Sequence, residues 1–308
     1  MKIAIAVFVI SLSGLNVLAQ GPPTLRIVTE VPNLPSELFY GDIKVKPLRL
    51  RPGTNTPVTI DDADFFVMHQ YFDFFSRVPD PSGLAFWINQ ITSCGSNAVC
   101  IDGQRANTSG AFFLSIEFKG TGYFVYLLHK GSFGDLPRYA TFMPDARQVG
   151  NGVIVGDGTD WQAILNANQT AFANAWVDRP AFLARYPTTL SATQYVDNLI
   201  TTAGLTPGQV NRDQIIADIS GGYPSATARA TGLRRIVESA AFDTKEKNPA
   251  FVLMQYIGYL RRSPDAAPDT NLDGYNFWLN KLNQHNGDFH AAEMVKSFIV
   301  SGEYRARF

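Results

Sequence analysis

The chain has few of the residues on which metal and redox chemistry depend. Two cysteines and four histidines occur among its 308 residues. The histidines are His69, His129, His285 and His290. None of them belongs to an H-E-x-x-H motif, and no histidine or further cysteine stands near Cys94 and Cys100 to complete a zinc site. The sequence therefore carries no signature of a zinc enzyme or of a zinc-binding module.

Net charge is nearly absent as well. The 26 basic and 27 acidic residues leave a formal charge of −1, which gives no long-range field to attract nucleic acid or an anionic membrane. One strand-like stretch carries a strip of basic residues, Lys44, Lys46, Arg49 and Arg51. A solvated strand face explains this strip more simply than a nucleic-acid site does. We therefore expect no nucleic-acid partner.

Long apolar runs are missing after the first 19 residues. The chain starts MKIAIAVFVISLSGLNVLAQ, with Lys2 ahead of an apolar run and small residues near Ala19. This order predicts a secretory signal peptide over residues 1–19, cleaved after Ala19, with an uncleaved anchor as the alternative. No later stretch reaches the ~20 apolar residues that a bilayer span needs. We expect a secreted, periplasmic or cell-surface protein with no transmembrane segment after cleavage.

The two cysteines lie close together in the segment SCGSNAVCI. In an exported protein, such a pair favours a short-range disulfide between Cys94 and Cys100, with a metal pair or free thiols as alternatives. The spacing is not C-x-x-C, and no lysine, arginine or histidine flanks either cysteine to lower a thiol pKa. We therefore predict a structural bridge and not a redox-active one.

Aromatic residues, by contrast, are abundant, and they recur in a repeated pattern. The chain has 22 phenylalanines and 12 tyrosines, and 45% of its residues are hydrophobic, which predicts a substantial core. QYFDFFSRVPD begins at Gln70, and QYIGYLRRSPD begins at Gln255, 185 positions later (255 − 70 = 185). The matched pairs include Tyr71/Tyr256, Arg77/Arg262, Pro79/Pro264, Asp80/Asp265, Gly83/Gly274 and Trp87/Trp278. A duplicated unit explains this match, and we expect Trp87 and Trp278 to be core residues.

Three related segments close the repeats. FFLSIEF, RIVESAAF and SFIVSGEY place Ser115, Ser239 and Ser301 at equivalent positions, where helix-end hydrogen bonding is a better explanation than nucleophilic attack. Three such endings predict three helical units over about 62–130, 190–242 and 249–308, with a further helix over 161–176.

Start and stop signals indicate that the units are helical. Asp80 is placed to cap a helix that has Pro81 at its first position, and Asn248-Pro249 resembles a second such start. The Gly- and Pro-rich stretch 131–158 predicts a surface loop. We therefore predict an all-α fold with about three repeated units in one compact domain over 61–308. A short extended or β-like arm over 20–60 would precede it.

These motifs resemble a known family. FVMHQYFDFFSRVPDPSGLAFW, CGSNAVCI, SGAFFLSIEFKGTGYFVY and the last segment from FVLMQYIGYLRRSPD onward are similar to the bacterial domain-of-unknown-function family 4214, over about residues 61–308. The resemblance implies a helical extracellular module that often accompanies Calx-β or surface-layer-type domains. It implies no established activity and no catalytic residue.

The segment DTNLDG is a candidate calcium loop. Asp269, Asn271 and Asp273 alternate oxygen ligands ahead of Gly274, as a hard cation on a tight turn requires. The bidentate glutamate of a complete loop is replaced by Asn280. The alternative is that Asp273 only caps a helix. No other cofactor is predicted.

Glu117 and Glu303 are the other candidates for chemistry. A carboxylate pair is what glycoside hydrolysis uses, but these two residues occupy equivalent repeat positions, which favours a role at helix ends. The leading hypothesis is a secreted, non-catalytic helical repeat module for interaction or assembly with a protein or cell-envelope partner. The alternatives are an extracellular hydrolase and a calcium-dependent adhesion module.

Overall fold

The computed structural model describes residues 58–156 and 158–308, together with the backbone of three short strands nearer the start of the chain. The strands β1 (Leu25–Val28), β2 (Glu37–Tyr40) and β3 (Ile43–Lys44) pair antiparallel in that order, with Leu25 opposite Tyr40. They lie within the predicted β-like arm. The predicted signal peptide and most of the basic strip lie outside the described residues.

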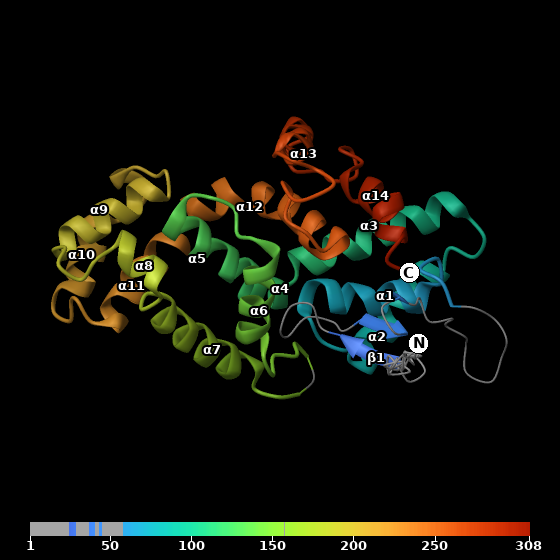
Figure 1. Cartoon of the computed structure of the whole chain (residues 1–308), viewed down its shortest axis with the longest axis horizontal. Helices are drawn as coiled ribbons and strands as arrows, with labels where there is room; N and C mark the ends of the chain where they lie inside the picture. Colours follow the sequence, from blue (N-terminus) through green and yellow to red (C-terminus); the bar gives the residue numbers. More distant parts are fainter. Residues whose placement is uncertain (1–24, 29–36, 41–42, 45–57, 157) are drawn as a thin grey trace, which may run out of the picture.

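The rest of the described chain is helical, so the predicted all-α class is confirmed. The helices are α1 (Ala63–Gln70), η1 (Tyr71–Phe75), α2 (Pro81–Thr92), α3 (Ala98–Leu114), α4 (Ile116–Phe118), η2 (Lys119–Tyr123), α5 (Phe124–Phe133), α6 (Tyr139–Gly150), α7 (Trp161–Trp176), α8 (Pro180–Arg185), α9 (Ala192–Thr202), η3 (Pro207–Gln209), α10 (Arg212–Ser220), α11 (Ala226–Val237), α12 (Ala240–Met254), η4 (Gln255–Leu260), α13 (Asp273–Gln284), α14 (Met294–Ile299) and α15 (Gly302–Arg305). They form an elongated body (Figure 1), with α8–α11 at one end and α1, α3 and α14 at the other.

The repeat in the sequence is also a repeat in backbone conformation. α1 widens into the π-helical turn η1 and stops at Ser76, which has φ 55°. α12 widens into the π-helical turn η4 and stops at Arg261, which has φ 53°. A positive φ is uncommon for residues other than glycine, so its recurrence 185 positions later (261 − 76 = 185) supports a duplicated structure. A proline follows each stop by three residues and keeps the helix from continuing.

A third copy of this turn stands between the other two. α5 ends at Gly134, which has φ 81°, and Pro137 again follows three residues later. The fold therefore contains three helix pairs. The first pair is α1 with η1 and α2, the second is α4 with η2, α5 and α6, and the third is α12 with η4 and α13. The second pair begins at Ile116, inside the unit predicted over 62–130.

Serine caps explain where these helices start. Ser115, Ser239 and Ser301 precede α4, α12 and α15, and each hydroxyl accepts a hydrogen bond from the backbone N–H three residues on. The donors are Phe118 at 3.0 Å, Phe242 at 3.3 Å and Tyr304 at 3.1 Å. Such a cap is worth ~1 kcal/mol because it satisfies an otherwise unpaired N–H group. The helix-end interpretation of the three serines is confirmed.

Two predicted boundaries fail because tertiary packing overrides local signals. α12 runs without a break through Pro249, so no helix starts at Asn248-Pro249. A proline inside a helix costs ~3 kcal/mol, and the fully buried run Ala250–Met254 offsets that cost. The predicted loop 131–158 instead contains α6, which buries Phe142 and Val149.

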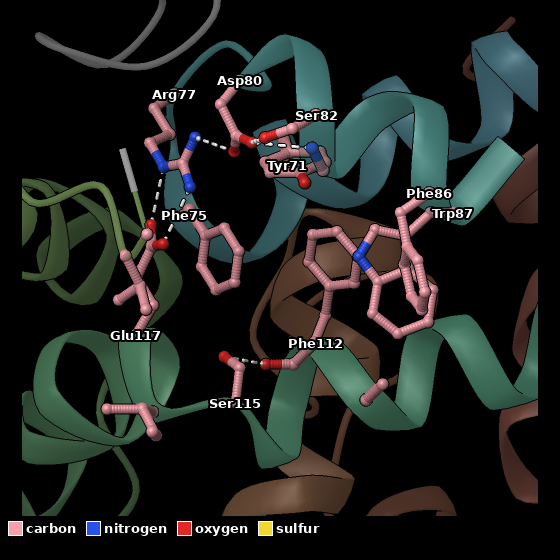
Figure 2. A pocket seen from close by; sticks show the side chains of 15 residues that line it. Tyr71, Phe75, Arg77, Asp80, Ser82, Phe86, Trp87, Phe112, Ser115 and Glu117 are labelled. Carbon is pink, nitrogen blue, oxygen red and sulfur yellow. Dashed lines mark hydrogen bonds and ion pairs between the residues drawn. The ribbon is translucent and has the colours of Figure 1, made fainter. Parts of the chain in front are cut away.

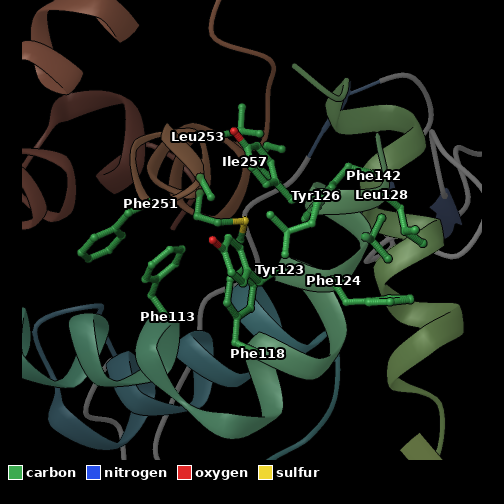
Figure 3. Packing of buried hydrophobic residues seen from close by; sticks show 14 of the residues in the cluster. Phe113, Phe118, Tyr123, Phe124, Tyr126, Leu128, Phe142, Phe251, Leu253 and Ile257 are labelled. Carbon is green, nitrogen blue, oxygen red and sulfur yellow. The ribbon is translucent and has the colours of Figure 1, made fainter. Parts of the chain in front are cut away.

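The core combines aromatic and aliphatic side chains from helices far apart in the sequence. Figure 3 shows Phe113 of α3 against Phe251 of α12, stacked with ring centroids 4.1 Å apart. At the end of the chain, Arg307 donates to Asp73 of η1 at 2.7 Å and to the carbonyl of Tyr259 in η4 at 2.8 Å. These contacts join the first and third helix pairs, so the three pairs share one core.

Candidate functional site

A pocket of about 430 Å³ opens beside the first helix pair (Figure 2). Its walls come from the end of η1, the start of α2, the junction of α3 with α4, and residues Val155 and Gly156. The side chains are mostly aromatic or aliphatic, and the charged or hydroxyl-bearing exceptions include Arg77, Asp80, Glu117 and two serines, Ser82 and Ser115. We call it the aromatic pocket.

The ion pair is formed by Arg77 and Glu117. Arg77 Nε donates to Glu117 Oε1 at 2.6 Å and Nη2 donates to Oε2 at 2.7 Å, a bidentate arrangement. Desolvation by burial lowers the pKa of Arg77, but the hydrogen bonds and charge of Glu117 outweigh it and hold that pKa above its ordinary value. Glu117 is 7% exposed and Arg77 is 15% exposed, so water competes little for either group. The arginine therefore occupies both carboxylate oxygens.

The local backbone places Arg77 at this position. The left-handed Ser76 ends η1, and Arg77 then lies with its guanidinium 4.9 Å from the Tyr71 ring centroid. Asp80 caps α2 by accepting from the backbone N–H of Gly83 at 2.7 Å, as the sequence predicted. A side chain at Gly83 would collide with the Tyr71 hydroxyl, because a Cβ there would lie 2.2 Å from it. Burial, followed by the charge of Asp80, raises the pKa of Tyr71 to about 12.

The same arrangement recurs in the third helix pair. Arg262 donates to both oxygens of Glu303, at 2.6 and 3.1 Å, and its guanidinium lies 5.3 Å from the Tyr256 ring centroid. A Cβ at Gly274 would lie 2.8 Å from the Tyr256 hydroxyl. Each glutamate is thus bound by the arginine of its own repeat. Glu303 is not among the residues that line the aromatic pocket, so the structure does not bring the candidate carboxylate pair together there.

The rim of the pocket is apolar and exposed. Phe86 is 54% exposed and Ile116 is 63% exposed, while Trp87 is half-buried against Phe112 with ring centroids 5.7 Å apart. The prediction that Trp87 and Trp278 are core residues is wrong, since both are half-buried. The reason is that α2 and α13 cover the core with one face only, which also leaves Phe277 57% exposed.

The predicted calcium ligands have other partners in the structure. Asp269 Oδ2 accepts from Arg262 Nη2 at 2.9 Å. Asn271 Oδ1 accepts from the backbone N–H of Asp273 at 2.9 Å, and its amide nitrogen donates to Asp273 Oδ2 at the same distance. Asp273 is the first residue of α13 and not its cap. Within the described residues, no group of three or more His, Cys, Asp or Glu side chains is arranged to hold a metal. Calcium binding here stays a prediction.

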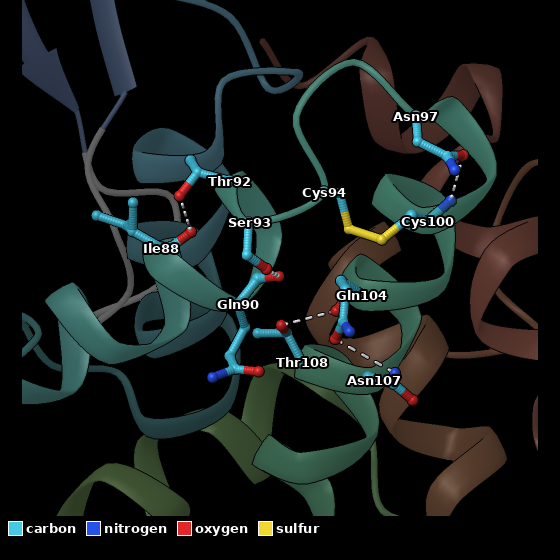
Figure 4. Close-up of a disulfide and its surroundings, with 10 residues drawn as sticks. All are labelled: Ile88, Gln90, Thr92, Ser93, Cys94, Asn97, Cys100, Gln104, Asn107 and Thr108. Carbon is cyan, nitrogen blue, oxygen red and sulfur yellow. Dashed lines mark hydrogen bonds between the residues drawn. A yellow bond between two sulfur atoms is a disulfide. The ribbon is translucent and has the colours of Figure 1, made fainter.

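The predicted disulfide is present between Cys94 and Cys100, with their Cα atoms 5.6 Å apart (Figure 4). It closes the turn between α2 and α3, and the Asn97 side chain in that turn accepts from the backbone N–H of Cys100 at 3.1 Å. Both cysteines are half-buried at the surface. The bridge therefore fixes the start of α3, the helix that carries Phe112 into the aromatic pocket.

The histidines do not contribute to this pocket. His285 and His290 are exposed, and His290 Nε2 lies 2.6 Å from the side-chain oxygen of Asn107. His69 lies among aromatic rings, with its centroid 4.5 Å from that of Phe65. Burial lowers the pKa of His129, and the nearby Asp135 carboxylate only partly opposes this shift.

Sequence reasoning missed the pocket itself. Phe112 and Ile116 of the FFLSIEF segment line it together with Phe75, and no local pattern connects that segment with Phe75. The repeated motif did single out Arg77 and Glu117, but as separate repeat residues and not as a pair.

Comparison with family models, with curated proteins and with solved structures found no match. Among the described residues, no helix is both long and apolar enough to span a bilayer. The geometry of the pocket therefore carries the functional argument.

Proposed function

We propose that the protein is a secreted, non-catalytic helical repeat module that binds a protein or cell-envelope partner at the bacterial exterior. In this proposal, the aromatic pocket receives an apolar side chain of a protein partner. The observation that carries the proposal is the exposed apolar rim of Phe86 and Ile116 around a pocket whose ion pair is internally satisfied.

The polar groups of the pocket favour binding over turnover. Both oxygens of Glu117 accept from Arg77, and a general acid or base needs an oxygen that can reach substrate. The Ser115 hydroxyl donates to the Phe112 carbonyl at 2.8 Å and accepts from the Phe118 N–H. Nucleophilic catalysis requires a base hydrogen-bonded to the serine, and within the described part of the chain Ser115 has no such partner.

The apolar groups favour a hydrophobic ligand group. Phe86 and Ile116 line the pocket and are 54% and 63% exposed, and surface clusters of large apolar side chains mark interaction sites. A volume of about 430 Å³ falls in the range of ligand pockets. It is large enough for an aromatic anchor, and buried aromatic anchors are among the residues that dominate binding energy at interfaces.

The exported location rests on two supporting features. The first 19 residues have the order of a secretory signal. The disulfide between Cys94 and Cys100 suits an oxidising compartment, because disulfides persist in secreted proteins and are rare in the cytosol. Detection of the processed protein in the culture medium or cell envelope, against a cytosolic marker, tests this part of the proposal.

A site-specific photo-cross-linker tests the binding surface. It would replace Phe86 in one variant and Phe277 in another, since these repeat-equivalent residues are almost equally exposed. On intact cells, we expect one protein to be captured from position 86 and not from position 277. The captured protein is then purified and titrated with the wild type. Equal capture from both positions, or no binding after purification, would contradict the proposal.

A further inference from the structure

A second cavity, of about 550 Å³, lies where the second and third helix pairs meet. Its walls come from the end of α5, the turn 134–138, α12, the turn 263–265 and α13. The two turns are joined by an ion pair between Arg138 and Asp265 and by a hydrogen bond of 3.0 Å from the Tyr139 N–H to the Ser263 hydroxyl. We call it the Glu246 cavity, after the carboxylate that lines it.

Glu246 is a buried carboxylate with an incomplete set of partners. Its side chain is 2% exposed. The Tyr126 hydroxyl, which is not among the lining groups, donates to Oε2 at 2.7 Å. The nearest cation among the described residues is the Lys245 ammonium, 4.0 Å from Oε1, which is beyond hydrogen-bond distance. A buried carboxylate is costly unless its oxygens are hydrogen-bonded and its charge is compensated, so Oε1 needs a donor.

The basic side chains around the cavity are committed elsewhere. Lys245 donates to the carbonyls of Ala203 and Gly204, and Lys130 donates to the carbonyl of Gly134 at 2.7 Å. Arg138 is paired with Asp265. Moving any of these groups to Glu246 would give up contacts that it already makes.

The remaining walls are mostly apolar. They include Pro249, Leu279 and Tyr275. The Tyr275 hydroxyl already donates a hydrogen bond to the Pro249 carbonyl at 3.0 Å, so it does not serve as a donor to Glu246. Leu272 is 37% exposed and therefore marks the solvent side. The cavity thus combines the buried, under-satisfied Glu246 carboxylate with an apolar body. A second lining carboxylate, Asp135, is 74% exposed to solvent and lies 3.1 Å from His129 Nε2.

We propose that the Glu246 cavity binds a small primary ammonium compound with an aliphatic or aromatic body, and that Glu246 is its counter-ion. An ammonium group supplies three donors and a positive charge at hydrogen-bond distance, whereas Lys245 lies 4.0 Å from Oε1 and donates to other groups. The apolar body would lie against Leu279 and Leu272. This site is separate from the aromatic pocket and does not depend on the proposed function.

The test uses n-butylammonium and benzylammonium as probes, titrated calorimetrically into the full processed chain. We expect both amines to bind the wild type, and n-butanol, which has no charge, to bind at least ~10-fold more weakly. Glu246→Gln keeps the shape of the side chain and should lose affinity for the amines by ~10-fold or more. Glu238→Gln is the matched control, because Glu238 is exposed and does not line the cavity.

A second variant covers the case in which Glu246→Gln fails to fold, as judged by circular dichroism. Leu272→Trp keeps the carboxylate but narrows the cavity from its solvent side, and it should weaken amine binding to a similar extent. The proposal is overturned if neither amine binds the wild type, if n-butanol binds as tightly as n-butylammonium, or if amine affinity is unchanged in whichever of the two cavity variants folds.

Discussion

The duplicated ion pair allows the effect of burial on the energy of an arginine–glutamate pair to be tested within a single chain. Arg77–Glu117 and Arg262–Glu303 have the same bidentate geometry, but Glu117 is 7% exposed and Glu303 is 35% exposed. Removing one partner of a buried pair leaves an uncompensated charge and costs ~3–5 kcal/mol, whereas exposed pairs contribute at most ~1 kcal/mol. The two glutamates should therefore differ in their effect on the free energy of unfolding.

The contacts that remain after each substitution sharpen the expectation. In Glu117→Ala, Arg77 keeps the Val78 carbonyl at 3.0 Å and Asp80 at 3.5 Å, so we expect a loss of ~2–4 kcal/mol. In Glu303→Ala, Arg262 keeps Asp269 at 2.9 Å and the loss should be ~0.5–1.5 kcal/mol. The predicted quantity is the difference between the two losses, at least ~0.5 kcal/mol and ~2 kcal/mol at the centres of the two ranges.

Urea unfolding followed by circular dichroism measures both losses, and equal m values between variants and wild type show that the comparison is valid. The double variant Arg77→Met/Glu117→Leu serves as a control. It removes both charges, so it should be more stable than Glu117→Ala alone. Equal losses for Glu117→Ala and Glu303→Ala, or a larger loss for Glu303→Ala, would refute the reasoning that burial decides the energy of this pair.

Three further predictions concern stability. The double variant Cys94→Ser/Cys100→Ser should fold with a loss of ~2 kcal/mol, because the bridge closes a short loop, and denaturing alkylation of the wild type should find no free thiol. Trp87→Ala should cost ~1–3 kcal/mol in urea unfolding, less than the ~3–5 kcal/mol of a fully buried tryptophan, and a larger cost would contradict its half-buried position. Burial lowers the pKa of His129, so the folded chain disfavours the protonated form and stability should fall as pH decreases through about 6.5. His129→Gln should flatten that part of a pH-stability curve, and an unchanged slope would contradict the assignment.

Local signals predicted those parts of the fold that depend on few neighbours. Ser115 and its two equivalents were recognised as helix-end residues, since a cap needs only its own next turn. The same holds for Asp80 ahead of Pro81. The disulfide followed from six-residue spacing and the expected oxidising compartment.

The missed features depend on distant packing. Pro249 was interpreted as a helix start, but the buried residues after it keep α12 continuous. The exposure of Phe86 depends on which face of α2 meets the core. In each case the sequence supplied the residue but not the neighbour that determines its role.

The central claim, that the aromatic pocket binds a protein partner, is tested most directly by affinity. The partner captured at position 86 would be titrated with the wild type, Phe86→Ser and Phe277→Ser. These substitutions remove the same side chain from equivalent and almost equally exposed positions, only one of which lines the pocket. We predict that Phe86→Ser weakens binding by at least ~10-fold, as loss of an interface anchor does, while Phe277→Ser binds like the wild type. Equal affinities for all three proteins would contradict the claim.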